Sequence, residues 1–184
     1  VGVAAIDIAL PIVYRPQNGK LIITWTDVST PANPAVAEQL TLQGQLMNSR
    51  KIGDVLYVFT RFDPWLEELK PAELNSEQQK ANETLLQKTP LSDLMPKYHF
   101  GEQADKPLTQ NCLLPTGVTT QQGFPSLVHI TAVNVKTKTL VGSTCINAPM
   151  QNFTMNQNHA FLIAHAPSTT GASKTLIHQF TLGE

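Results

Sequence analysis

The chain has 184 residues, of which 41% are hydrophobic and 15% are charged, so it can form a folded core and shows no compositional sign of disorder. Its formal net charge is −1 and its 13 Lys and Arg residues are scattered, which argues against a surface for nucleic acid. The apolar runs are shorter than a bilayer span, so no membrane-spanning segment is expected.

Strands separated by turns are predicted for the first third of the chain. Leu21–Asp27 is rich in β-branched and aromatic residues, which favour an extended strand. The run from Asp27 to Pro34 predicts a turn, because Asp and Ser side chains bond to the backbone and Pro fixes φ. A second strand is expected over Val36–Leu42, where apolar and polar residues roughly alternate, and Gly44 ends it.

The next predicted element is a hairpin of Leu46–Ile52 and Val55–Thr60 that turns at Gly53-Asp54. It belongs to a stretch that occurs twice, because residues 47–59 (MNSRKIGDVLYVF) line up with residues 151–163 (QNFTMNQNHAFLI). Each copy consists of a strand, a polar turn and a strand. The repeat matters because a hairpin by itself would suit any antiparallel sheet.

A second pattern precedes each copy of the hairpin. Ile23–Val28 matches Ile130–Val135, and Ile177–Leu182 is a third, weaker copy. The 47 residues from Ile130 to Ile177 are close to the ~40 to 50 residues of one four-stranded propeller blade. The repeat therefore predicts an all-β fold of antiparallel four-stranded β-propeller blades, with one short helix in an insertion.

The insertion covers residues from about 62 to 125, which do not fit a blade and are too many for an ordinary connection. Ser76 and Gln79 form a capping-box pattern, an apolar stripe follows, and Thr89-Pro90 ends it, so a helix is predicted over Ser76–Lys88. The members of the stripe are Leu74, Ala81, Leu85 and Leu86. Either the stripe packs on the edge of a blade or it binds a partner.

Four stretches also resemble one known family. They are residues 26–34 (TDVSTPANP), 42–60 (LQGQLMNSRKIGDVLYVFT), 94–98 (LMPKY) and 175–180 (TLIHQF). The chain after Lys20 is similar to secreted bacterial and archaeal proteins with a C-terminal β-propeller domain distantly related to WD40 repeats. The resemblance implies an exported propeller without established chemistry, and it transfers no catalytic residue.

The length implies that only part of a propeller is present. Residues 1–184 are expected to form a single propeller-like domain of two to three blades, whereas a complete ring needs several more. A blade is covered by neighbours on both sides, so an open arc leaves apolar faces exposed. We expect the remaining blades of a longer chain, or a second copy of this chain, to cover them.

The two cysteines, Cys112 in the insertion and Cys145 at the end of a strand, lack the C-x-x-C spacing of a zinc or redox motif. The exported family favours a disulfide between them, with two buried thiols as the alternative. No metal and no cofactor are predicted. Secretion, or a periplasmic or cell-envelope location, follows from the same resemblance.

Two functions remain open, because no local catalytic motif is found and a triad built from distant segments has no sequence signature. The first is a non-catalytic module that binds a protein or glycan partner at the cell envelope. The second is a hydrolase or lyase with its site in the central funnel of the propeller. Asn48, Arg50 and Asn152 are the candidate funnel residues, although they could instead satisfy backbone groups near the blade turns.

Trp65 is the candidate contact residue of the insertion. It follows the hairpin in the segment Arg61–Leu66, beside Pro64, and Trp is enriched at interface hot spots. The alternative is that Phe62 and Trp65 pack the insertion onto its blade.

Overall fold

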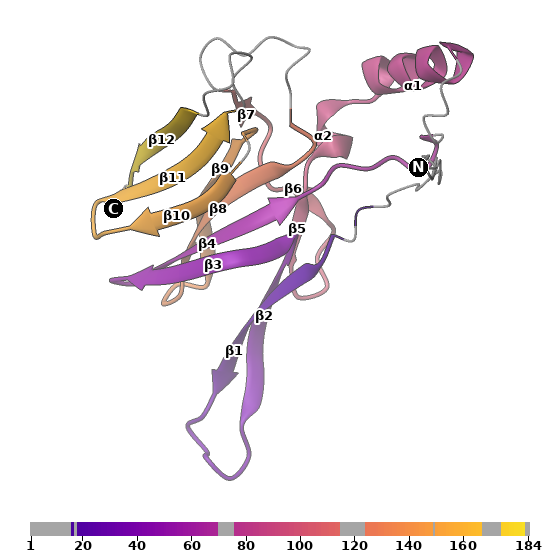
Figure 1. Cartoon of the computed structure of the whole chain (residues 1–184). Coiled ribbons are helices and arrows are strands. Elements are labelled where there is room, and N and C mark those ends of the chain that lie inside the picture. The colour runs from indigo at the N-terminus through magenta and orange to yellow at the C-terminus, as the bar shows by residue number, and fades with distance from the viewer. Residues whose placement is uncertain are drawn as a thin grey trace, which may run out of the picture.

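The structure of the chain, a computed structural model, describes residues 16, 18–69, 76–114, 124–148, 150–166 and 174–182. Strands dominate these residues (Figure 1). The elements in chain order are β1 (Lys20–Asp27), β2 (Ala35–Gln43), β3 (Gln45–Ile52), β4 (Val55–Phe62), α1 (Ser76–Lys88), α2 (Leu91–Leu94), β5 (Lys97–Phe100), β6 (Lys106–Pro107), β7 (Cys112–Leu113), β8 (Leu127–Asn134), β9 (Thr139–Ile146), β10 (Met150–Met155), β11 (His159–Ala166) and β12 (Lys174–Thr181).

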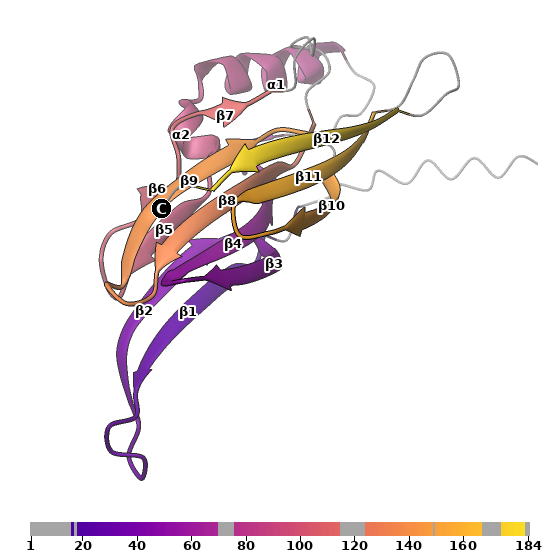
Figure 2. The same cartoon turned by 90° about the vertical axis from the view of Figure 1, so that its left-hand side faces the viewer.

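The described strands form three sheets, with the orders β1-β2-β5-β6, β3-β4-β8-β9-β7 and β10-β11-β12. In the second sheet β3, β4, β8 and β9 are antiparallel neighbours in chain order, which is the arrangement of one propeller blade. The sheets lie one behind another, with the five-stranded sheet in the middle (Figure 2). The predicted class, antiparallel blades forming part of a propeller, is confirmed.

The strand pairing shows that the sequence repeat is a structural repeat. Asn48 lies opposite Phe59 in the middle sheet, and their counterparts Asn152 and Ile163 lie opposite each other in the third sheet. A β-bulge immediately precedes the asparagine in both hairpins. Bulges hold a strand in register and increase its twist, so the two hairpins share their curvature as well as their pairing.

The third strand of each blade repeats as well. Phe59 lies opposite Ile130, and the counterpart Ile163 lies opposite Ile177. The matching strands β1 and β8 also each carry a bulge at the same place in the repeat, after Trp25 and after Ala132. Thus β1 and β2 correspond to the last two strands of a blade, and β10, β11 and β12 correspond to the first three strands of the next.

Two apolar clusters bind the middle sheet to its neighbours. On one face Val58 and Val133 pack with Leu40 and Leu42 of β2, all four nearly or fully buried. On the other face Phe59 and its neighbours pack against β10, β11 and β12. The rings of Phe59 and Phe153 stack with their centroids 4.1 Å apart. Alternate side chains of a strand point to opposite faces, so β4 supplies both clusters.

The predicted helix of the insertion has the predicted bounds, Ser76–Lys88, but the insertion also contains a second helix of four residues, α2, where only one was expected. No side chain is buried among residues 77–88 of α1, and Leu86 is 44% exposed, so the described part of the apolar stripe does not pack on a blade. Leu74 lies outside the described residues. The rest of the insertion is more closely joined to the body: β5 pairs with β2, and Met95 and Leu108 are buried.

No helix in the described residues is both long enough and apolar enough to cross a membrane.

We expect Phe59→Ala to lower the free energy of unfolding by about 3 to 5 kcal/mol, because it removes a fully buried ring between two sheets and leaves a cavity. Val141→Ala is the control, because Val141 is 55% exposed in the same sheet and should change stability by less than ~0.5 kcal/mol. Urea unfolding followed by circular dichroism measures both. Equal effects of the two variants would contradict the stacked-sheet core.

Candidate functional site

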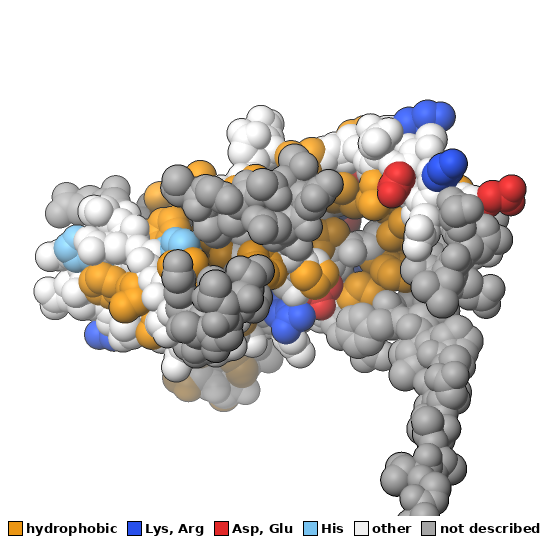
Figure 3. All heavy atoms as spheres, turned by 45° about the horizontal axis from the view of Figure 1, so that its top comes forward, with side chains coloured by type: hydrophobic (Ala, Val, Ile, Leu, Met, Phe, Trp, Pro, Cys, Tyr) orange, Lys and Arg blue, Asp and Glu red, His pale blue; other side chains and the backbone are white. Residues whose placement is uncertain are grey.

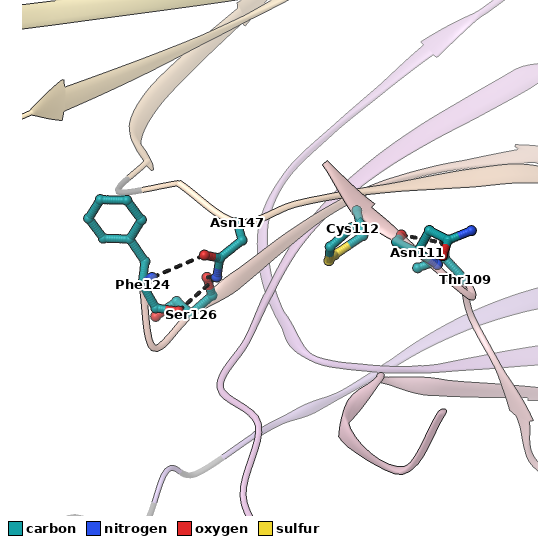
Figure 4. Close-up of a disulfide and its surroundings, with 7 residues drawn as sticks. Thr109, Asn111, Cys112, Phe124, Ser126 and Asn147 are labelled. Atoms are coloured by element: carbon teal, nitrogen blue, oxygen red, sulfur yellow. Dashed lines mark hydrogen bonds between the residues drawn. A yellow bond between two sulfur atoms is a disulfide. The ribbon is translucent and has the colours of Figure 1, made fainter. Parts of the chain in front are cut away.

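A disulfide between Cys112 and Cys145 closes the far edge of the middle sheet (Figure 4). It lies where the two-residue strand β7 pairs in parallel with β9, and Cys112 is the register partner of Cys145. The bridge spans 33 residues of sequence and ties the insertion to the blade. The pairing that the family resemblance implied is therefore present.

Asn147 holds the chain on both sides of this edge (Figure 4). Its backbone N–H donates to the carbonyl of Leu113 at 2.9 Å. Its side-chain Nδ2 donates to the carbonyls of Phe124 and Ser126 at 2.7 and 3.1 Å, and its Oδ1 accepts the Phe124 N–H at 3.0 Å. The buried amide thus fixes the end of β7 and the segment that leads into β8.

His129 lies beside the disulfide on β8 and is fully buried. Its register partners are Thr60 on β4 and Cys145 on β9. Neither ring nitrogen of His129 has a hydrogen-bond partner among the described residues, and the Thr60 hydroxyl is also buried without one. Burial lowers the pKa of His129 to about 4, because the charged imidazolium would be desolvated.

Cys112, His129 and Cys145 bring their ligand atoms within 4.8 Å of one another. Thiolate and imidazole are the side chains that bind zinc and related ions, so this is the group in the described residues with the donors to hold a metal. The sequence prediction missed it because the three residues lie on three strands. The available signal was Cys145 and His129 on adjacent predicted strands, but their juxtaposition depends on the register.

A surface hollow of about 350 Å³ opens at Cys112. Met95, Leu127 and Asn147 also line it. Met95 and Leu127 belong to the buried cluster that contains Cys145. The disulfide is therefore buried on the His129 side and accessible from this hollow on the other.

Trp65 lies at a second hollow, of about 390 Å³, where the insertion meets the start of β1 and the end of β2. The indole is half-buried, and its Nε1 is buried without a hydrogen-bond partner in the described ranges. Polar side chains make up much of the remaining wall: Asn18, Lys20, Gln43, Glu67, Asp93 and Lys97.

Hydrogen bonds fix the framework of this second hollow. Asn18 donates from Nδ2 to the Asp63 carbonyl at 2.7 Å and accepts the Asp63 N–H at 2.8 Å. The Gln43 side chain accepts the Lys97 N–H at 3.0 Å. Four chain segments therefore bound the hollow, and these side-chain hydrogen bonds join them in two pairs.

The candidate funnel residues bond to the backbone. Asn48 and Asn152 each accept, through Oδ1, the N–H of the following residue, at 2.7 and 2.8 Å. Arg50 donates from Nη1 to the Met155 carbonyl at 2.7 Å and so joins β3 to β10. The structure places the three residues on the first strands of two adjacent blades, and within the described part of the chain it brings no acid, base and nucleophile together around them.

The comparison with protein families agrees with this repeat. The family model of the beta propeller domain matches residues 7–184. The chain belongs to the beta propeller domain family. Comparisons with curated proteins and with solved structures gave no match.

We expect the stability of this propeller chain to fall between pH 6.5 and about 4 because of His129. The unfolded chain binds a proton near the ordinary pKa of 6.5, whereas the folded chain resists protonation down to about 4. The unfolded state therefore binds more protons than the folded state between pH 6.5 and about 4. The free energy of unfolding should fall by ~3 kcal/mol by the time the pH reaches about 4. Thr60 and the disulfide, its neighbours across the sheet, carry no charge.

His129→Leu should remove this contribution, so the difference in unfolding free energy between the variant and the wild type should grow as the pH falls from 6.5 to 4. His178→Leu, on the matching strand β12, is the control. A constant difference across that range would show that the pKa of His129 is the same in the folded and the unfolded chain.

We expect alkylation of the unfolded, unreduced protein to find no free thiol. The double variant Cys112→Ser, Cys145→Ser should lose about 2 to 4 kcal/mol of stability, as expected for a loop of this size. Mass spectrometry with and without reductant checks the first point, and urea unfolding checks the second. Two alkylated cysteines before reduction would disprove the bridge.

Proposed function

We propose that this propeller chain is an exported, non-catalytic module of the cell envelope and that the hollow at Trp65 binds a glycan. The observation that carries the proposal is the composition of that hollow: one half-buried indole whose N–H has no hydrogen-bond partner among the described residues, surrounded by amide, carboxylate and ammonium side chains. Most small-molecule pockets are apolar with few polar groups, whereas a polar wall beside one aromatic ring suits a ligand with many hydroxyls.

The bonds of the funnel residues support a non-catalytic role. Asn48, Arg50 and Asn152 each form a side-chain hydrogen bond to the backbone of the blades. The disulfide supports export, because such bridges persist in oxidising compartments.

A protein partner is the second candidate, and α1 is the observation that favours it. Its described residues leave Leu86 exposed and Leu85 half-buried on the side of the helix that carries the apolar stripe. Charged side chains are few on the face shown in Figure 3 and gather mainly toward the end where α1 lies. A helix with an uncovered apolar stripe fits a hydrophobic groove of another protein.

The open faces of the outer sheets need further cover, which we propose comes from remaining blades or from a second copy of the chain. Three residues of the middle sheet pack against the third sheet. The positions that match them in the third sheet lie on its outer face and are also hydrophobic. In matching order these are Tyr57, Phe59 and Ile130 in the middle sheet and Phe161, Ile163 and Ile177 in the third. Ile177 is 65% exposed, whereas its counterpart Ile130 is 8% exposed.

The glycan proposal can be tested through fluorescence, because the chain has two tryptophans, Trp25 and Trp65. Trp25 donates from Nε1 to the Val135 carbonyl at 2.8 Å and lies away from the hollow. We expect soluble oligosaccharides of envelope glycans to shift the emission of the wild type and of Trp25→Phe but not of Trp65→Phe. Calorimetry should show at least a tenfold loss of affinity for Trp65→Ala, a loss of about 1.4 kcal/mol.

Lys88→Gln on α1 is the matched control outside the hollow and should bind like the wild type. A fluorescence response that persists in Trp65→Phe would place the site elsewhere. If no oligosaccharide binds, a photo-crosslinker at position 86 tests the protein partner. A crosslink that Leu85→Glu abolishes and Gln87→Glu preserves would then assign the function to α1.

A further inference from the structure

Cys112, His129 and Cys145 together have the donor set of a metal site, two sulfurs and an imidazole; His129 and Cys145 are buried, and Cys112 lies at the hollow. Three adjacent strands supply it: β7, β8 and β9. The register places His129 next to Cys145 and Cys145 next to Cys112, so the donors form one row across the sheet. Backbone pairing of β7 and β8 with β9, and the bond from the Asn147 N–H to the Leu113 carbonyl, hold the three strands together in addition to the disulfide.

The second observation is the state of His129. Its side chain is fully buried, and both ring nitrogens lie without a hydrogen-bond partner within the described residues. Buried polar groups are nearly always bonded, and an exception calls for an explanation. A metal ion on one nitrogen would provide it.

We propose that reduction of the Cys112–Cys145 disulfide converts this row into a zinc site, with the two sulfurs and one nitrogen of His129 as ligands. The reductant is a dithiol, such as an exchange protein with two active thiols. It attacks one sulfur of the bridge, transfers two electrons and two protons overall, and becomes a disulfide itself. Zn²⁺ then displaces the two thiol protons to solvent as the thiolates bind.

Charge selects a divalent ion. Two thiolates and a neutral imidazole carry a charge of −2, so Zn²⁺ gives a neutral centre, whereas a monovalent ion would leave a net charge in a buried place. Zinc accepts two Cys and one His with water in the fourth position. The hollow at Cys112, of about 350 Å³, provides room for that water and the route for the metal and the reductant.

The movement required is small. The Cα atoms of the two cysteines are 4.5 Å apart. Two thiolates on one tetrahedral zinc lie roughly 3.8 Å from each other, given Zn–S bonds of about 2.3 Å. Rotation of the side chains can provide this separation while the strand pairing is kept.

To test the proposal, the folded chain is reduced with a phosphine, freed of reductant without oxygen, and titrated with Zn²⁺ against a chromogenic chelator. We expect one tightly bound zinc per reduced chain and none at this affinity in the oxidised chain. Co²⁺ in place of zinc should give sulfur-to-metal charge-transfer bands and the intense visible bands of four-coordinate cobalt.

His129→Leu should weaken zinc binding by ~100-fold or more, since even the loss of a group outside the ligand set costs about 10- to 100-fold. The double variant Cys112→Ser, Cys145→Ser should abolish it. His178→Leu, on the matching strand of the third sheet, should leave it unchanged. Circular dichroism confirms that each variant is folded.

Equal zinc binding by the oxidised and reduced chains would overturn the proposal, and so would wild-type affinity in His129→Leu. If reduction unfolds the chain, zinc is expected to restore its β spectrum at one ion per chain, and failure to do so would also overturn the proposal. None of these outcomes depends on a glycan, so the zinc site and the proposed binding function are tested separately.

Discussion

The middle sheet is buried on both faces, and this constraint organises the rest of the structure. Strand β4 sends Val58 toward β2 and Phe59 toward β10 and β11, so neither face can be left to water. A single sheet cannot satisfy both sides by itself. Neighbouring sheets are therefore part of what makes this one stable. The same logic extends to the third sheet, whose outer face repeats the residues with which the middle sheet is buried.

The insertion fits this stack because it leaves and returns along neighbouring strands. It departs after β4 and returns at β8, and these strands are paired over their whole length, from Val55 with Asn134 to Phe62 with Leu127. The insertion therefore separates β4 and β8 in the sequence, but the two strands still pair as neighbours in one blade. Its return is held by β7, the disulfide and Asn147, while α1 lies outside the stacked sheets (Figure 1). Loops fixed by a rigid scaffold in this way commonly carry binding residues.

Much of the fold could be predicted because its signals are local or repeated. β-Branched and aromatic residues, rough alternation and the turn residues Asp, Ser, Pro and Gly identified β1 to β4, and the capping-box pattern and Thr89-Pro90 gave both ends of α1. The sequence repeat predicted the hairpin of β10 and β11 without any knowledge of long-range contacts. The strands β5, β6 and β7 were missed because elements of two to four residues have no periodicity to detect.

Site residues with a local sequence signal could be predicted, and those whose position depends on strand pairing could not. The cysteine pair was accessible through family resemblance, whereas His129 was not singled out, because its position beside Cys145 depends on the pairing of β8 with β9. Trp65 was noticed as a large aromatic residue beside a proline. The polar wall around it comes from segments far apart in the sequence, Asn18, Gln43 and Lys97 among them, and only the fold assembles it.

Met95 connects the two hollows of the insertion. It is 2% exposed, lies in the buried cluster with Cys145, and lines both the hollow at Cys112 and the hollow at Trp65. Met95 therefore packs against the region of the two sulfurs on one side and forms part of the wall of the Trp65 hollow on the other. The cysteine row and the tryptophan hollow are distinct in chemistry, but they share a wall.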